Sequence, residues 1–261
     1  MTPPVALTIA GSDSGGGAGL AADLRTFAAL GVHGALAVTT VTAQDTVRVH
    51  RAAAVAPDLL ADQIDVVLAD LPVAAAKTGF LGSPANVEAV ADRAGALPHL
   101  VVDPVLVAHD GAPILDAVGA YRDRLLPHAT VATPNHREAA LLLGRDLLHD
   151  DDLADAAHAL RALGPRWVVI TGGALGGPDA VDVVAGPSGT RALRAPRIDT
   201  VNTHGSGCSF AAAIAARLAH GDQPDAAIDR AKAFVSAAVA GAATWRLGDG
   251  RGPVDHLGWG A

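Results

Sequence analysis

Short apolar runs recur along the chain and predict the strands of a sheet. They consist mainly of Val, Ile, Leu and Ala, and a segment long enough for a helix separates most of them. The runs cover residues 5–10, 35–41, 73–76, 100–102, 131–132 and 167–170. Strands that are apolar on both faces belong in a parallel sheet covered by helices on both sides. We therefore expect an α/β fold of three layers, folded as a single domain over residues 1–261.

The segments between these runs carry helix signals. In residues 18–30, leucine and phenylalanine recur at spacings of four and three, which places them on one face of a helix. Three residues are expected to cap the starts of helices: Ser83, Asp58 and Asp151. Two more polar segments, residues 48–54 and 181–195, are expected to form strand pairs at a sheet edge.

Composition and charge narrow the class of partner. The formal net charge is −8, and the 19 lysine and arginine residues are scattered, so the chain lacks the basic patch that nucleic acid or an anionic membrane requires. Cys208 is the only cysteine, which excludes an intramolecular disulfide. Residues 1–4 do not resemble a signal peptide, and no apolar stretch approaches the roughly 20 residues that cross a bilayer. We expect a cytoplasmic protein that binds neither nucleic acid nor membrane.

A glycine-rich loop at residues 202–208 leads into an apolar helix expected over residues 209–218. Glycines let backbone N–H groups approach a ligand closely, and the helix start adds partial positive charge, so the loop is suited to an anion such as a phosphate in transfer. A thiol at a helix start has a lowered pKa, which makes Cys208 a candidate base for an attacking hydroxyl. The alternative is a small buried cysteine beside an ordinary glycine turn.

A second glycine loop, residues 11–19, follows the first strand. It lacks the lysine of a P-loop and the glycine spacing of a dinucleotide site. Gly11 and its neighbours would let a flat ligand lie against the backbone, Asp23 would reach a hydroxyl or ring amine, and the Gln44 amide would pair with the edge of a heterocycle. Taken alone, Asp23 also fits a helix-start charge, and Gln44 also fits a hydrogen-bonded loop residue.

Acidic and amide side chains follow two neighbouring strands. Asp103 ends the run at residues 100–102, and Asn135 and Glu138 follow the next run. Their oxygens suit Mg²⁺ bound partly through substrate phosphates, so a magnesium-nucleotide site is one interpretation. An Asp-Pro turn and helix-start capping are the alternatives. The 11 histidines show no zinc spacing, and we assign them no metal.

The motifs occur together and in order along nearly the whole chain. They are residues 6–19, 42–46, 77–79, 102–105, 133–135 and 202–208. This series resembles the hydroxymethylpyrimidine/phosphomethylpyrimidine kinase family of thiamine biosynthesis, which belongs to the ribokinase-like superfamily. The resemblance implies a ribokinase-like three-layer sandwich that phosphorylates 4-amino-5-hydroxymethyl-2-methylpyrimidine and then its monophosphate. It also implies ATP and Mg²⁺ as cofactors and a homodimer.

The resemblance also assigns roles to individual residues. The pyrimidine contacts would be Gly11, Asp23, Gln44, Phe80 and Val107. The anion hole would be Gly205, Ser206, Gly207 and Cys208, with Cys208 as the base. The nucleotide contacts would be Asn135, Thr171, Gly173 and Thr203. The metal would be held by Asp103 and Glu138.

Four positions depart from the family pattern. His109 stands where lysine is usual, and Thr171 replaces the lysine of a Lys-Gly-Gly segment, so two positive charges are absent. A lost charged contact can cost about 1.5–3 kcal/mol, so we expect weaker nucleotide binding or slower transfer. Phe80 replaces a usual methionine, and Asp45 replaces a usual asparagine.

Two other functions fit part of this pattern. Pyridoxal kinases phosphorylate a hydroxymethyl group on a similar ring, but relatives that prefer pyridoxal tend to have methionine at the position of Gln44. A non-catalytic pyrimidine-binding protein would explain the two missing lysines. The intact glycine loop around Cys208 argues against that alternative.

Overall fold

An eight-stranded sheet forms the middle layer of the molecule in the computed structural model, which describes residues 2–107, 112, 114–146, 148–173 and 175–260. The strand order is β10-β9-β8-β7-β6-β5-β1-β2. Their bounds are β1 Val5–Ala10, β2 His33–Val38, β5 Val73–Thr78, β6 Val101–Val102, β7 Val131–Ala132, β8 Trp167–Ile170, β9 Asp179–Gly186 and β10 Gly189–Pro196. The six strands β8, β7, β6, β5, β1 and β2 are parallel. Strands β9 and β10 extend this sheet in antiparallel orientation.

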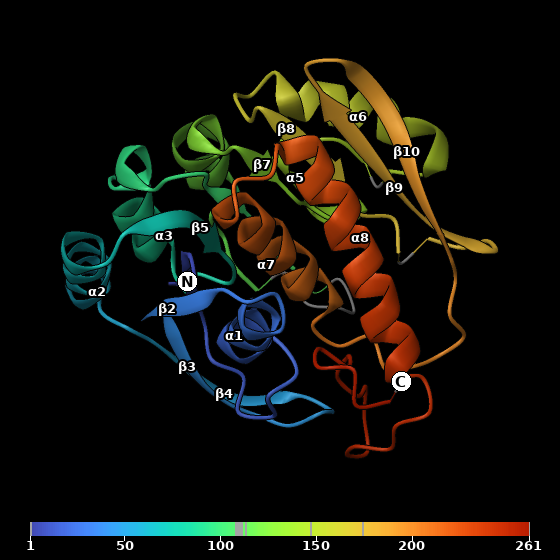
Figure 1. The fold of residues 1–261 in the computed structure, drawn as a ribbon. Coiled ribbons are helices and arrows are strands. Elements are labelled where there is room, and N and C mark those ends of the chain that lie inside the picture. The colour runs from blue at the N-terminus through green and yellow to red at the C-terminus, as the bar shows by residue number, and fades with distance from the viewer. Residues whose placement is uncertain (1, 108–111, 113, 147, 174, 261) are drawn as a thin grey trace.

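Helices cover both faces of this sheet because successive side chains of each strand point to opposite sides. One face carries α2 Pro57–Asp70, α3 Pro84–Ala91, α5 His136–Leu143 and α6 Leu153–Arg161. The other face carries α1 Gly19–Ala29, α7 Ser206–Ala219 and α8 Pro224–Gly241. In β1, Leu7 and Ile9 face the first group while Ala6 faces the second. Figure 1 shows α7 and α8 side by side over the sheet. The three-layer α/β fold is confirmed.

Short helical turns fill the connections. They are η1 Ala94–Ala96, α4 Val118–Ala120, η2 Tyr121–Leu125, η3 Leu126–His128 and η4 Asp150–Asp152. Three of the helix-start predictions have clear outcomes. Ser83 caps α3 and accepts a hydrogen bond from the Asn86 N–H at 3.1 Å, as expected. Asp58 does not cap, because α2 begins one residue earlier, at Pro57. Asp151 does not cap either, because it lies inside η4.

A separate two-stranded sheet lies beside the main one. It pairs β3 Thr40–Gln44 with β4 Val49–Ala54. The apolar run at residues 35–41 was expected as one strand, but it is divided between β2 and β3 at Thr39, whose N–H donates to Ala10 O at 3.0 Å. Residues 48–54 therefore pair with β3 instead of an edge of the main sheet. The hairpin of β9 and β10 does lie at the main sheet's edge, as expected for residues 181–195.

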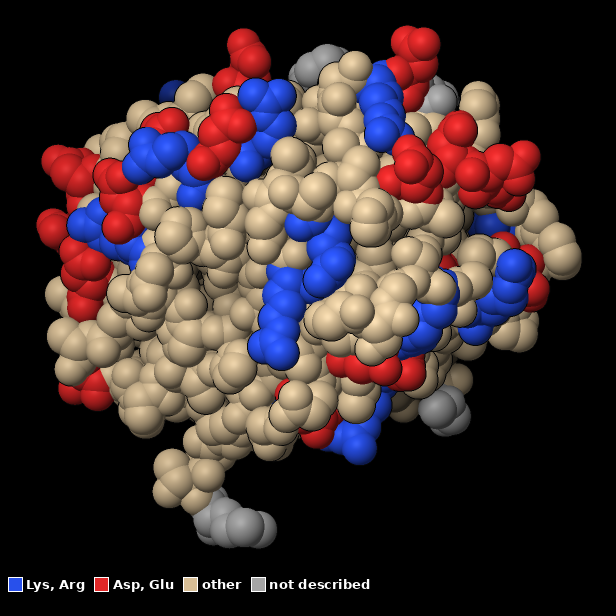
Figure 2. All heavy atoms as spheres, turned by 90° about the horizontal axis from the view of Figure 1, so that it is seen from above, with Lys and Arg blue, Asp and Glu red and all other residues tan. Residues whose placement is uncertain are grey.

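The carboxyl ends of the parallel strands meet at one edge of the sheet. The chain places β2 on one side of β1 and β5 on the other, so the strand order reverses there, the point at which open α/β sheets generally bind ligands. On the face shown in Figure 2, acidic and basic side chains are interspersed around the perimeter. Among the described residues, no helix combines the length and the apolar character needed to cross a membrane.

Candidate active site

Asp13 organises the glycine loop that follows β1. Its Oδ1 accepts the Gly15 N–H at 2.9 Å, and its Oδ2 accepts the N–H groups of Gly17 at 3.0 Å and Ala18 at 2.8 Å. Burial alone would raise the pKa of Asp13, but the hydrogen bonds from His204 and from the loop amides lower it overall. The carboxylate is therefore charged at neutral pH and holds the loop in shape.

The same loop is tied to β3. The Ser14 hydroxyl donates to Gln44 O at 2.7 Å and accepts the Gln44 N–H at 2.7 Å. The Gln44 side-chain nitrogen lies 3.5 Å from His204 Nε2. A Cβ added to Gly11 would lie 3.4 Å from a ring carbon of Phe80, so these two residues are neighbours. The structure thus brings three of the expected pyrimidine contacts to the surroundings of this loop.

The loop before α7 packs directly against the first one. Gly205 has a φ of +80°, and a Cβ there would lie 1.9 Å from Gly17 O, so only glycine fits. His204 Nε2 joins the two loops through Asp13 Oδ2 at 2.9 Å. Because of the turn at Gly205, α7 begins at Ser206, three residues earlier than expected.

The start of α7 presents free backbone donors. The Ser206 N–H donates to Thr203 O, and the Ser209 N–H donates to Gly205 O. The N–H groups of Gly207 and Cys208 have no acceptor in the described part of the chain. Unsatisfied first-turn amides at the positive end of a 14-residue helix are suited to an anion, and anion binding here stays a prediction.

A buried ion pair lies beneath this helix start, and no sequence motif indicated it. Lys77 Nζ lies 3.0 and 2.9 Å from the two carboxylate oxygens of Asp23, and the Thr8 hydroxyl donates to Asp23 Oδ2 at 2.6 Å. Both members of the pair are fully buried. The carboxylate predicted to contact the pyrimidine is occupied by Lys77 and Thr8, so the direct contact of Asp23 stays a prediction. A lysine at the end of an otherwise apolar strand was the available signal.

The expected low pKa of Cys208 is wrong. Burial, together with the charges of Asp103 and Asp23, outweighs the lowering by Lys77 and by the Gly19 amide and raises the pKa of this thiol to about 12. The helix start favours a thiolate, but the two nearby carboxylates oppose one. The thiol is therefore protonated at neutral pH in the protein without ligands.

Asn135 and Glu138 cap α5. The Asn135 side chain accepts the N–H groups of Arg137 at 2.9 Å and Glu138 at 3.0 Å, while Glu138 Oε2 accepts the Asn135 N–H at 2.9 Å. Glu138 also faces the backbone N–H groups of Leu106 and Val107, which places Val107 beside it. The capping alternative thus describes both residues in this structure, and their ligand contacts stay predictions.

The carboxyl groups of Asp103 and Glu138 are buried near each other, and the charge of Lys77 offsets only part of the rise in the pKa of Asp103. Burial raises the pKa of Asp103 to about 6, and burial together with the Asp103 charge raises the pKa of Glu138 to about 8. The hydroxyl of Thr78, whose carbonyl accepts the Asp103 N–H at 3.1 Å, is buried without a partner in the described part of the chain. Among the described residues, no three His, Cys, Asp or Glu side chains gather closely enough to hold a metal ion. A cation that keeps most of its waters, as Mg²⁺ does, still fits this two-carboxylate donor set.

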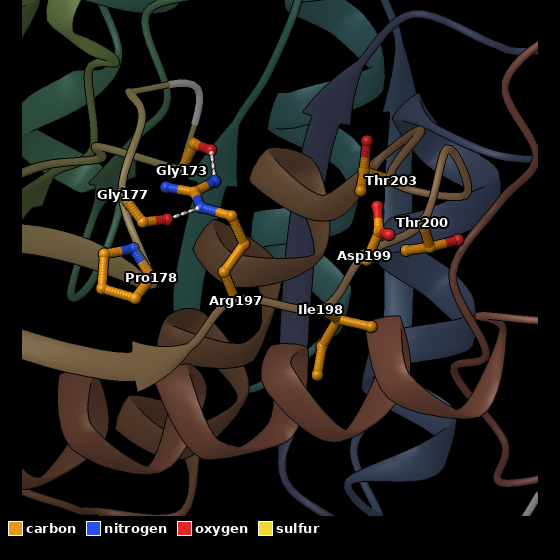
Figure 3. Close-up of a pocket in the computed structure, with 8 residues that line it drawn as sticks. All are labelled: Gly173, Gly177, Pro178, Arg197, Ile198, Asp199, Thr200 and Thr203. Atoms are coloured by element: carbon orange, nitrogen blue, oxygen red, sulfur yellow. Dashed lines mark hydrogen bonds between the residues drawn. The ribbon is translucent and has the colours of Figure 1, made fainter.

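A cavity of about 480 Å³ lies next to the anion loop, at the end of β8. Gly173 and Thr203 line it, as Figure 3 shows. Thr171 pairs with Asn135 across neighbouring strands, and its N–H donates to Pro134 O at 3.0 Å. Two of the four expected nucleotide contacts therefore line one cavity, and the other two are paired with each other at the end of β8.

Arg197 shapes the wall of this cavity. Its guanidinium donates to Gly173 O and Gly177 O, both at 2.7 Å (Figure 3). It also donates to Asp179 O at 3.0 Å and to Leu175 O and Gly176 O. Most of its N–H donors are thus directed at one loop. No sequence motif pointed to this arginine, because its partners are backbone carbonyls whose direction a sequence does not encode.

Comparison with known proteins decides the family. The profile of the family described as phosphomethylpyrimidine kinase matches residues 13–255. The chain belongs to the phosphomethylpyrimidine kinase family. The chain is 48% identical over 262 residues to a hydroxymethylpyrimidine/phosphomethylpyrimidine kinase of Streptomyces coelicolor, covering 99% of this chain and 96% of that protein. It is 44% identical over 255 residues to the thiamine biosynthesis bifunctional protein ThiED of Geobacter sulfurreducens, covering 96% of this chain and 52% of that protein.

Solved structures of similar proteins have the same three-layer fold as this chain. An ADP complex of Bacillus subtilis pyridoxal kinase superimposes with a TM-score of 0.90 at 39% identity, covering 98% of each chain. Together with the parallel sheet between two helical layers, this likeness confirms the ribokinase-like fold that the sequence indicated.

The departures from the pattern of phosphomethylpyrimidine kinases fall in different places. Thr171 lies at the end of β8 beside the cavity. His109 lies outside the described residues. Asp45, in place of the usual asparagine, accepts the N–H groups of Val47 and Arg48, both at 2.8 Å, and so holds the turn between β3 and β4. Phe80 lies against Gly11.

Proposed function

We propose that this chain transfers a phosphoryl group from ATP to 4-amino-5-hydroxymethyl-2-methylpyrimidine and then to its monophosphate, giving the diphosphate used in thiamine biosynthesis. The single observation that carries the proposal is the position of the α7 start. Its free amides lie between the glycine loop next to Gln44 and a cavity of about 480 Å³. The names of the relatives, including one that is bifunctional in thiamine biosynthesis, support the choice of reaction.

The pyrimidine would lie against the backbone at Gly11 and the ring of Phe80. Gln44 would pair with the heterocycle edge through its amide, whose backbone is fixed by two hydrogen bonds to Ser14. Val107 would contribute backbone contacts from the loop after β6. Asp23 would lie beneath the pyrimidine and influence it through its charge, because its carboxylate is bound to Lys77. This arrangement positions the hydroxymethyl group toward the anion loop.

The N–H groups of residues 205–208 would stabilise the negative charge on the phosphoryl group in transfer. Cys208 would accept the proton of the attacking hydroxyl, which requires its thiolate. Asp103 and Glu138 would hold Mg²⁺, which offsets charge on the phosphates and on these two carboxylates and so favours ionisation of Cys208. Asn135, Thr171, Gly173 and Thr203 would contact the nucleotide.

The chain would act as one kinase domain in a cytoplasmic homodimer. Apolar side chains of the small sheet and its turn support the dimer, because Val41, Val47 and Val49 are 57%, 64% and 53% exposed. Sedimentation velocity of the wild type and of the double variant V41D/V49D tests this. A dimer that becomes monomeric in the variant supports the small sheet as the interface, and a monomeric wild type refutes the dimer.

The reaction is tested by product analysis. Wild type, Cys208→Ala and Cys208→Ser are incubated with MgATP and either the hydroxymethylpyrimidine or pyridoxal, and phosphorylated products are resolved by mass. Pyrimidine mono- and diphosphate from the wild type, reduced about 100-fold or more in Cys208→Ala, is the expected result for a lost base. Phosphorylation of pyridoxal alone would show a pyridoxal kinase instead. Pyrimidine binding without any product would indicate a non-catalytic relative.

A further inference from the structure

Arg251 is a half-buried cation without an acidic partner. No Asp or Glu of the described residues lies within ion-pair distance of its guanidinium, whereas half of the other arginines, such as Arg93 and Arg191, contact acidic side chains. Burial lowers the pKa of Arg251, and no nearby carboxylate restores it. A positive charge removed from water and left unpaired costs free energy, which a bound anion would offset.

The fold holds Arg251 against the anion loop. Its guanidinium donates to the Thr203 hydroxyl, and its backbone N–H donates to Thr46 O at 3.1 Å. The next residue, Gly252, accepts the His204 N–H at 3.1 Å and donates to Asn202 Oδ1 at 3.1 Å. The C-terminal segment is therefore bonded to three successive residues that lead into Gly205.

Thr203 connects this cation to the ligand space. It lines the cavity of about 480 Å³ and lies two residues before Gly205, where the anion loop turns into α7. A guanidinium next to the Thr203 hydroxyl is thus close to both the cavity and the loop that carries the free amides of Gly207 and Cys208. Arginine is suited to such a place because its planar fork binds phosphate through two parallel hydrogen bonds.

We propose that Arg251 binds a phosphate group beside the anion loop and supplies positive charge that the chain lacks at Thr171. The inference rests on the proposed kinase function. Arg197, the arginine that lines the cavity, does not serve this purpose, because its guanidinium is directed at the backbone carbonyls of Gly173, Gly177 and Asp179. The phosphate belongs either to the nucleotide or to the pyrimidine monophosphate of the second reaction. Both sources share the same chemistry.

The test compares phosphorylated ligands with their unphosphorylated counterparts. Binding of the ATP analogue AMP-PCP, adenosine, the pyrimidine monophosphate and the free pyrimidine is measured by titration calorimetry on wild type, R251Q and R251K. R246Q is the matched control, because Arg246 is an exposed arginine of the same C-terminal segment. Thermal unfolding of each variant reports whether the fold is kept.

We expect R251Q to weaken one phosphorylated ligand about tenfold or more, the loss expected for one charged hydrogen bond. The unphosphorylated counterpart keeps its affinity, R251K lies between, and R246Q matches the wild type. If R251Q loses affinity for AMP-PCP, Arg251 binds a phosphate of the nucleotide. If R251Q loses affinity for the pyrimidine monophosphate, Arg251 binds the phosphate of that substrate. Equal loss for phosphorylated and unphosphorylated ligands, or no loss, overturns the role of Arg251 while leaving the kinase proposal intact. A wild type that binds no phosphorylated ligand overturns both.

Discussion

The chain has two lysines, and each forms a buried ion pair with an aspartate, but in different surroundings. Lys77 directs its ammonium at both carboxylate oxygens of Asp23, at 3.0 and 2.9 Å, and neither side chain is exposed. Lys232 divides its donors between Asp182 Oδ2 at 2.7 Å and Ala180 O at 3.0 Å, and its side chain is 11% exposed. The first pair is closed to water, and water reaches the edge of the second.

The neighbours of the two pairs differ more than the pairs themselves. Lys77 lies near Asp103 and Cys208, so its charge acts on groups of the proposed reaction centre. The second carboxylate oxygen of Asp182 accepts the Gly172 N–H at 3.0 Å. Lys232 therefore holds in place, through Asp182, the start of the loop that borders the cavity. The Lys77–Asp23 pair therefore influences the charge of nearby titratable groups, whereas the Lys232–Asp182 pair fixes the position of a loop backbone.

The largest effect is expected for Lys77→Met. The change leaves Asp23 buried with only Thr8 as a side-chain donor, and breaking a buried pair in this way costs about 3–5 kcal/mol. It also removes the positive charge that lowers the pKa of Cys208, so catalysis falls as well. Denaturant unfolding measures the loss of stability, and product formation under conditions where the variant is folded measures the loss of activity.

A double variant separates these two effects. K77M/D23L replaces both charges by apolar side chains, so the unpaired carboxylate is gone and most of the stability returns. The activity stays low because the double variant lacks both the Lys77 charge that lowers the pKa of Cys208 and the Asp23 carboxylate of the proposed pyrimidine site. A stable double variant with wild-type activity would contradict the view that Lys77 acts on the reaction centre.

The next effect is on the thiol itself, through Asp23→Asn. The Asp23 charge raises the pKa of Cys208, and Lys77 lowers it, so neutralising Asp23 removes the first influence and leaves the lysine charge uncompensated. The pKa of Cys208 therefore falls below its value of about 12. At a given pH between 7 and 9 the variant holds more thiolate and reacts faster with iodoacetamide.

This measurement is unambiguous because Cys208 is the only cysteine in the chain. Its alkylation rate is followed against pH in the wild type and in Asp23→Asn, with unfolded protein as the reference. Equal or slower alkylation in the variant would show that the Asp23 charge does not reach the thiol.

The contrast between the two lysines also shows what the sequence predicted well. Strand runs, the helix after Ser83 and the clustering of motifs at the carboxyl ends follow from local patterns, since apolar periodicity and parallel pairing decide them. The pairing of Lys77 with Asp23, 54 residues apart, depends on which face of β5 meets α1. The raised pKa of Cys208 depends first on its burial and then on a balance of two carboxylates and one lysine, which no local motif contains.

The smallest effect is expected for Lys232→Met. Water can partly solvate Asp182 once the lysine is gone, so the destabilisation should be about 1–3 kcal/mol, below that of Lys77→Met. Asp182 still accepts the Gly172 N–H, but it is no longer anchored to α8. The loop then costs a fraction of a hydrogen bond more to order, so we expect the KM for ATP to rise by about two- to fivefold. Alkylation of Cys208 should match the wild type, because Lys232 does not act on the thiol. A shifted alkylation profile in Lys232→Met would remove the distinction between a pair that sets charge and a pair that holds backbone.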